Sequence, residues 1–181
     1  MNIINDTLFL EDISVETLMQ EYGSPLYVYE ESVLRSQFRQ LASGFPEELL
    51  EIHYSMKANS NPSLLKILLE EGSSIDAVSE FEVRLALESG FEPQQIIFTG
   101  NNNTLAEIEF CVEQNVAVNL GSLALLEIYG QRYPQTTVSV RVNPGIGAGH
   151  HSHCITGGPD SKFGIYHDQI ENAFALAKKY K

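Results

Sequence analysis

A regular recurrence of short apolar runs constrains the fold of this chain more than any other feature of its sequence. Five runs rich in Val, Ile and Tyr are predicted to be buried strands, at residues 51–57, 74–78, 95–99, 116–120 and 137–142. The spacing between their centres, at positions 53, 75, 97, 118 and 140, is 22, 22, 21 and 22 residues. A strand, a turn and a helix fit into each interval, so the sequence predicts a repeated βα unit.

Helix start and stop signals occupy the intervals between these runs. The predicted N-terminal caps are Asn61 before Pro62, Ser79 with Glu82, Thr104 with Glu107, Ser122, and Asp168 with Glu171. Glycines at positions 72, 90 and 130 mark predicted helix ends. A helix is therefore expected after each of the five runs.

Parallel strands joined by helices need cover on both faces or closure into a barrel. The regular repetition favours an α/β fold, the parallel (β/α)8 barrel, of which about five of the eight strands are visible here; a whole barrel takes roughly 250 residues. The alternative is a complete five-stranded doubly wound sheet of flavodoxin type, which the 181 residues also fit. That alternative requires a reversal of strand order, which the even spacing does not suggest.

Charge and cysteine content restrict the expected partners and location. The chain has 11 Lys and Arg against 24 Asp and Glu, a formal net charge of −13, which disfavours nucleic acid and anionic membrane surfaces. Residues 1–12 have no signal-peptide pattern and no apolar run approaches a membrane helix, so a cytoplasmic location is expected. Cys111 and Cys154 do not indicate a disulfide framework, and Cys111 is interpreted as helix packing.

Candidate functional residues follow the predicted strands, where parallel barrels place their active sites. The first strand ends at Lys57; burial at that position would lower the pKa of its amine and favour Schiff-base chemistry. An exposed lysine with an apolar stem is the alternative. Asp76, near the end of the second strand, is predicted to orient Lys57 or a cofactor, or else to serve in the turn beside Ser79.

The fifth strand leads into the most unusual part of the sequence. Arg141 could direct its guanidinium at an anionic cofactor or form a structural ion pair. The glycine-rich segment 145–149 precedes His150, His151, His153 and Cys154, whose spacing is not that of paired zinc ligands. We expect no metal site there, and a flexible active-site loop instead. Downstream, the amides of residues 156–164 and the Ser161 hydroxyl could bind a phosphate, or could form an ordinary turn.

Together these segments resemble a known enzyme family. The motifs are YSMKAN at 54–59, DAVS at 76–79, RVNP at 141–144, and HCITG at 153–157 leading into SKFG at 161–164. In this order they are similar to the fold-type III pyridoxal-phosphate enzymes, specifically the diaminopimelate decarboxylases of the ornithine, diaminopimelate and arginine decarboxylase group. The resemblance runs from about residue 25 to residue 181.

The resemblance implies a cofactor, a reaction and an assembly. Lys57 would hold pyridoxal 5'-phosphate, with Asp76, Arg141 and Ser161 around the cofactor or its phosphate. The implied reaction is decarboxylation of meso-2,6-diaminopimelate to L-lysine by a homodimer. Residues 1–24 would be an extension associated with a C-terminal β domain, and residues 25–181 a partial pyridoxal-phosphate-binding barrel.

Two further expectations concern activity. Other parts of the family's active site lie beyond Lys181, so this chain by itself is expected to be inactive. The alternatives are a non-catalytic barrel that carries pyridoxal phosphate, and a decarboxylase of another basic amino acid or a carboxylated polyamine.

Overall fold

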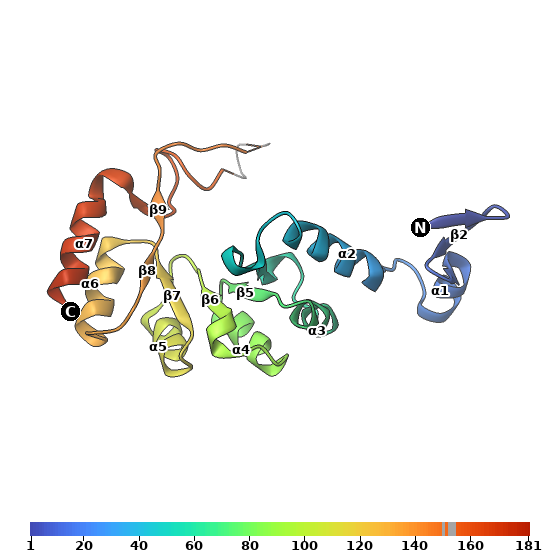
Figure 1. Cartoon of the computed structure of the whole chain (residues 1–181), viewed down its shortest axis with the longest axis horizontal. Coiled ribbons are helices and arrows are strands. Elements are labelled where there is room, and N and C mark those ends of the chain that lie inside the picture. Colours follow the sequence, from blue (N-terminus) through green and yellow to red (C-terminus); the bar gives the residue numbers. More distant parts are fainter. Residues whose placement is uncertain (150, 152–154) are drawn as a thin grey trace. The chain divides into compact units, whose positions relative to one another are not determined.

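The computed structural model describes residues 1–149, 151 and 155–181. The chain divides into two compact units, Met1–Glu51 and Ile52–Lys181 (Figure 1). The predicted domain boundary after residue 24 stays a prediction. No helix among the described residues is both long and apolar enough to cross a membrane.

The first unit begins with a small antiparallel sheet that the sequence analysis did not predict. Its strands, β1 (Asn2–Ile4), β2 (Thr7–Leu10) and β3 (Ile13–Ser14), are adjacent in chain order, and α1 (Val15–Tyr22) follows. Asn5 and Asp6 link β1 to β2 with φ angles of 49° and 62°, as tight hairpin turns require. A second helix, α2 (Glu31–Ala42), and a 3-10 turn, Glu47–Leu49, complete the unit.

A five-stranded parallel sheet forms the centre of the second unit. Its strands are β4 (His53–Ser55), β5 (Ser74–Ala77), β6 (Ile96–Phe98), β7 (Ala117–Leu120) and β8 (Ser139–Val140). They pair in the order β4-β5-β6-β7-β8, which is their order in the chain. The order has no reversal, so the flavodoxin-type alternative is wrong and the predicted barrel topology is confirmed.

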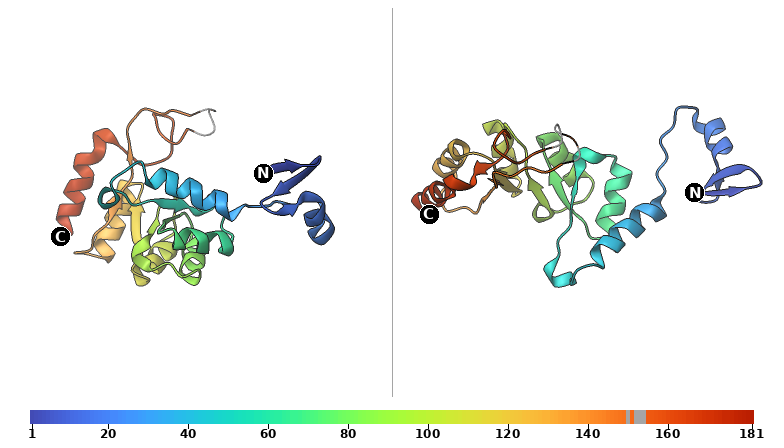
Figure 2. Two further views of the ribbon diagram at one scale, coloured as in Figure 1. Left: turned by 45° about the vertical axis from the view of Figure 1, so that its right-hand side comes forward. Right: turned by 90° about the horizontal axis from the view of Figure 1, so that it is seen from above.

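Helices follow the strands as predicted (Figures 1 and 2). They are α3 (Pro62–Glu70), α4 (Glu80–Glu88), α5 (Leu105–Glu113), α6 (Leu123–Arg132) and α7 (Ile170–Lys179), with 3-10 turns at Met56–Ala58, Pro93–Gln95 and His167–Gln169. Four predicted caps are confirmed, because the side chains of Asn61, Ser79, Thr104 and Ser122 each accept a bond from a backbone amide of the first turn.

Two local predictions are wrong. Gly130 does not end α6, which continues to Arg132; a Cβ at this position would collide with the ring of Tyr180, so the glycine permits close packing against the end of α7. Asp168 caps no helix, because it lies inside the 3-10 turn that precedes α7, and the cap position is taken by Gln169 without a side-chain bond.

The core lies between the sheet and the helices. Its strand residues include Ile75, Ala77, Ile96, Phe98, Val118 and Leu120, and its helix residues include Leu65, Val83, Ile108, Cys111 and Leu126. Cys111 is a free, fully buried thiol, which confirms its predicted packing role, and burial raises its pKa to about 12. Cys154 lies outside the described residues.

A short parallel pair continues the chain beyond β8. Strand β9 (Val142–Asn143) pairs in parallel with β10 (Ile165–Tyr166). The chain leaves the sheet after β9 and pairs with that strand again some twenty residues later. The Ile165 amide donates to the Arg141 carbonyl at 2.7 Å. This pair fixes both ends of the segment that contains residues 144–164.

The contact between α6 and α7 includes a charged group whose titration is testable. The Glu127 carboxylate accepts a bond from Lys179 Nζ at 2.7 Å and another from the Tyr180 hydroxyl. These donors, Lys179 first, lower the pKa of Glu127 from 4.5 to about 2. The carboxylate therefore supports the contact above pH 4.5, and that support is lost as the pH falls through about 2.

We expect Lys179→Ala to raise the pKa of Glu127 toward its ordinary value, because alanine removes the strongest donor. Carbon-detected NMR titration of the Glu127 carboxyl measures this directly. Lys178→Ala is the matched control, since Lys178 is an exposed neighbour on the same helix. An unchanged Glu127 titration in Lys179→Ala would contradict the assignment.

Candidate functional site

The two faces of the parallel sheet differ in chemistry. On β5, Ile75 and Ala77 are fully buried in the core, so Asp76 between them points to the opposite face. Met56 is also fully buried, whereas its neighbour Lys57 is exposed. The face turned away from the core is therefore the polar one.

The same alternation places neutral polar side chains on this face in the middle strands. Thr99 follows the fully buried Phe98, and Asn119 lies between the buried Val118 and Leu120. Thr99 and Asn119 therefore point the same way as Asp76.

Arg141 adds a cation to the polar face. It lies between Val140 and Val142, which line a cavity of about 170 Å³ together with side chains of α6 and α7. Because these valines face the helices, Arg141 points to the opposite side. The sheet thus places Asp76 and Arg141, two of the four predicted residues, on one polar face with Thr99 and Asn119 between them, and Lys57 follows the adjacent strand β4.

Lys57 lies in the 3-10 turn directly after β4. Its expected burial is not observed, because the strand ends at Ser55 and β4 pairs only with β5 in the described sheet. Among the described residues, its Nζ has no hydrogen-bond or ion-pair partner. The amine is therefore accessible to a ligand in this structure.

Asp76 is held by neighbouring strands on both sides. Ser55 Oγ donates to Asp76 Oδ2 at 2.6 Å, and Thr99 Oγ1 donates to Asp76 Oδ1. Each carboxylate oxygen thus receives one hydroxyl, and no cation of the described part of the chain pairs with it. The turn-forming alternative for Asp76 is not observed, because Ser79 caps α4 through its own hydroxyl.

The guanidinium of Arg141 contacts an aromatic ring and not a carboxylate. Its Cζ lies 4.5 Å from the centroid of Phe163, a cation–π distance, and the residue is half-buried. No acidic side chain in the described ranges forms an ion pair with it, so the structural ion pair considered above is not observed. A half-buried cation without a counter-charge is suited to an anionic ligand.

Ser161 lies in the loop before β10, two residues before Phe163. Its Oγ accepts a bond from the Phe163 amide at 3.2 Å, and its own amide donates to Gly158 O at 3.2 Å. Ser161 also lines a cavity of about 390 Å³ formed by residues 147, 155 and 157–161. Lys57, Asp76 and Arg141 do not line that cavity, and the described link between Ser161 and Arg141 is Phe163, whose amide bonds Ser161 and whose ring contacts Arg141.

Asn143 organises this segment and was not among the predicted site residues. It is 1% exposed; its Oδ1 accepts bonds from the amides of Gly145 and Gly158, and its Nδ2 donates to Gly158 O, all at 3.0 Å. The Gly158 amide, a candidate for phosphate binding, is therefore already bonded. The sequence feature that could have indicated Asn143 is its position as a polar residue directly after the apolar run at residues 137–142.

Two buried polar atoms at the same end of the sheet have no partner. One is Asn101 Nδ2, a donor on a residue that follows β6. The other is Asn119 Oδ1, an acceptor on a residue of β7. Buried groups of this kind are rare unless a ligand or water satisfies them. Together with the Lys57 amine and the Arg141 cation, they fit a ligand that carries an electrophilic carbonyl, polar ring substituents and an anionic group.

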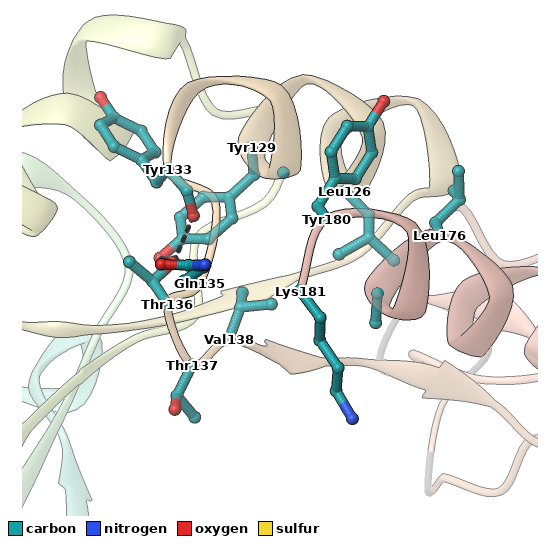
Figure 3. A pocket seen from close by; sticks show the side chains of 12 residues that line it. Leu126, Tyr129, Tyr133, Gln135, Thr136, Thr137, Val138, Leu176, Tyr180 and Lys181 are labelled. Atoms are coloured by element: carbon teal, nitrogen blue, oxygen red, sulfur yellow. Dashed lines mark hydrogen bonds between the residues drawn. The ribbon is translucent and has the colours of Figure 1, made fainter.

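The other candidate features lie elsewhere or outside the described residues. No group of three potential metal ligands occurs among the described residues; His150, His153 and Cys154 are not described, and His151 is exposed. A cavity of about 370 Å³ between α6, α7 and the loop that leads into β8 is lined by Tyr129, Val138 and Tyr180 among others (Figure 3). It lies on the helix side of the sheet and includes none of the predicted site residues.

Comparison with known proteins identifies the family. Residues 31–181 match the family described as "Pyridoxal-dependent decarboxylase, pyridoxal binding domain". The chain belongs to the pyridoxal-dependent decarboxylases. The predicted cofactor, pyridoxal phosphate, and the predicted barrel are thereby confirmed.

Similar proteins within the pyridoxal-dependent decarboxylases share one name. The chain is 42% identical to diaminopimelate decarboxylase of Methanothermobacter thermautotrophicus, over 88% of this chain and 38% of that protein. It is 40% identical to the Staphylococcus aureus enzyme of the same name, over 97% of this chain and 41% of that one. The chain therefore spans about two-fifths of the length of these curated relatives.

A solved structure of the same decarboxylase family superposes closely. Diaminopimelate decarboxylase from Helicobacter pylori, complexed with L-lysine, has a TM-score of 0.84 and 32% identity, covering 91% of this chain and 43% of that one. The five strands described above are therefore consecutive strands of a parallel (β/α)8 barrel. None of these comparisons tests the roles of Lys57, Asp76, Arg141 or Ser161.

Proposed function

We propose that the intact protein containing this chain decarboxylates meso-2,6-diaminopimelate to L-lysine, with pyridoxal phosphate held by Lys57. The observation that carries the proposal is an accessible amine directly after the first strand of a pyridoxal-binding barrel. The substrate follows from the relatives with 42% and 40% identity, which are both named diaminopimelate decarboxylase.

Lys57 Nζ would form the covalent link to the cofactor aldehyde. When bound, pyridoxal phosphate supplies an electron sink for the electron pair that carbon dioxide leaves behind. The chain's own contribution is to place charges and hydrogen bonds around that centre. Asp76, on the strand beside β4, would hold the proton on Lys57 Nζ whenever that nitrogen is cationic.

Arg141 and Ser161 would serve anionic groups. The Arg141 guanidinium, fixed on Phe163, offers several N–H donors to a phosphate or carboxylate. Ser161 Oγ accepts from the Phe163 amide and keeps its own O–H available to donate. Asn101 Nδ2 and Asn119 Oδ1 would each bond a polar ring substituent of the bound ligand or a water beside it.

Assembly and location belong to the same proposal. We propose a homodimer, as the resemblance implies, and a cytoplasmic location, as the biosynthetic role implies. The part of the active site supplied by the remaining sequence of the intact protein would complete the site, and the 181-residue chain alone would be inactive.

Turnover of defined substrates tests the reaction. The intact protein, supplied with pyridoxal phosphate, is expected to release carbon dioxide from meso-diaminopimelate and to form L-lysine in equal amount. L-Ornithine and L-arginine serve as competitor substrates, and we expect kcat/KM for them to be lower by at least about 100-fold, because each mismatched polar contact costs a few kcal/mol. Cofactor binding without carbon dioxide release from any of these amino acids would instead support the non-catalytic carrier.

A further inference from the structure

We propose that Ser55 and Thr99 are positioning residues that fix the Asp76 carboxylate on the polar face of the sheet, so that it supports the positive charge that develops at Lys57. The inference rests on the proposed function, since it concerns the same site. Neither hydroxyl was a candidate from the sequence alone.

The geometry restricts Asp76 from two sides. Ser55 is the backbone neighbour of Asp76 in the β4–β5 register and donates to Oδ2 at 2.6 Å. Thr99 follows β6, on the other side of β5, and donates to Oδ1. One bond to each oxygen fixes both the direction of the side chain and the plane of its carboxylate.

The charge of Asp76 is oriented but not neutralised. A hydrogen bond from a hydroxyl is stronger when the acceptor is ionised, but the hydroxyl carries no positive charge that could neutralise the acceptor. Because no described cation pairs with Asp76, its negative charge remains for a cation that arrives at the site. The nearest candidate in sequence is Lys57, which follows Ser55 by two residues, so the backbone that carries one of the two donors also carries the lysine.

Other hydroxyls on or beside strands of this sheet bond differently. Ser139 Oγ on β8 donates to the backbone carbonyl of Val118 at 3.3 Å. Ser73 Oγ, directly before β5, donates to the backbone carbonyl of Ser74 at 2.8 Å. Backbone carbonyls thus satisfy hydroxyls that only need a partner. Ser55 and Thr99, from two separate strands, converge on one carboxylate, which points to orientation of that group.

The test uses the intact protein, stripped of cofactor and reconstituted with pyridoxal phosphate. Thr99→Val and Ser55→Ala each remove one donor, Thr99→Ser retains it, and Ser139→Ala removes a hydroxyl on the same face that does not bond Asp76. Circular dichroism confirms folding. The two positions are independent, so either variant decides the question if the other fails to fold.

We expect Thr99→Val and Ser55→Ala to lower kcat/KM by about tenfold, mainly through kcat, because each deletes one hydrogen bond to a charged group. The absorbance band of the cofactor bound to Lys57, near ~420 nm, reports a cationic nitrogen and disappears as the pH rises and that nitrogen loses its proton. In both variants this loss is expected to begin at a lower pH than in the parent. Thr99→Ser and Ser139→Ala are expected to keep the parent's pH profile and rate within about twofold.

A double-mutant cycle separates positioning from a general structural role. If Thr99 acts through Asp76, Thr99→Val should cost less than about twofold in an Asp76→Asn background. An undiminished cost there, or parent-like pH profiles and rates in both single variants, would overturn the positioning role while leaving the proposed function intact. A parent protein that forms no band at Lys57 would overturn the proposed function as well.

Discussion

Replacing Lys57 with alanine is expected to abolish covalent attachment of pyridoxal phosphate and to lower kcat of the intact protein by at least about 10⁴-fold. Alanine has no nitrogen to form the link, and the remaining polar groups of the face can hold the cofactor only through non-covalent contacts. The measurement is loss of the ~420 nm band, combined with borohydride reduction and mass spectrometry of the labelled peptide.

Lys66→Ala is the matched control for this prediction, because Lys66 is an exposed lysine on α3, nine positions later in the chain. It should retain the band and full turnover. A reduced cofactor found on any lysine other than Lys57, or a band that survives Lys57→Ala, would show that the accessible amine after β4 is not the attachment point.

Replacing Asn143 with alanine is expected to weaken the base of the 144–164 segment by roughly 3 kcal/mol, because each buried polar group left without its partner costs about 1–3 kcal/mol. The substitution removes three hydrogen bonds: the buried Gly158 amide loses its partner, and the Gly158 carbonyl keeps only the bond from the Ser161 amide. Hydrogen exchange at the Ile165 amide, whose own bond to Arg141 O the substitution does not touch, measures the loss.

Asn172→Ala, at an exposed position of α7, provides the comparison and should change exchange at Ile165 very little. Protection of Ile165 that matches the parent in Asn143→Ala would mean that the β9–β10 pair holds the segment without Asn143. Arg141 precedes this segment and Phe163 lies near its end, so their cation–π contact is expected to loosen together with it.

Much of the barrel could be predicted because its signals are local. The strand spacing and the caps at Asn61, Ser79, Thr104 and Ser122 depend on residues only a few positions apart. The wrong prediction at Gly130 arose because the role of this residue depends on a partner far away in the sequence. Gly130 is a residue type typical of helix ends, but here a glycine is needed because the Tyr180 ring, fifty residues later, leaves no room for a Cβ. The strands β1–β3 were missed because they have only two to four residues and are largely exposed.

The candidate site was predicted in part for a similar reason. Lys57, Asp76 and Arg141 carry charge and lie on or just after strands; the sheet places Asp76 and Arg141 on one face, and Lys57 follows the adjacent strand β4. Ser55 and Thr99 are neutral, and their common partner depends on strand register, which the sequence does not state directly. The alternation of buried and polar residues along each strand was the usable signal, since it assigns Thr99 and Asn119 to the face of Asp76.

The bonds that hold Asp76 also bear on how the protein folds during synthesis. They join residues 21 and 23 positions apart, each the length of a single βα unit. Closing such short loops costs little chain entropy compared with long-range pairing. Ser55, Asp76 and Thr99 need only β4, β5 and β6, so their arrangement should form on the ribosome as soon as the third strand has emerged. The orientation of Asp76 would then be set long before the barrel can close.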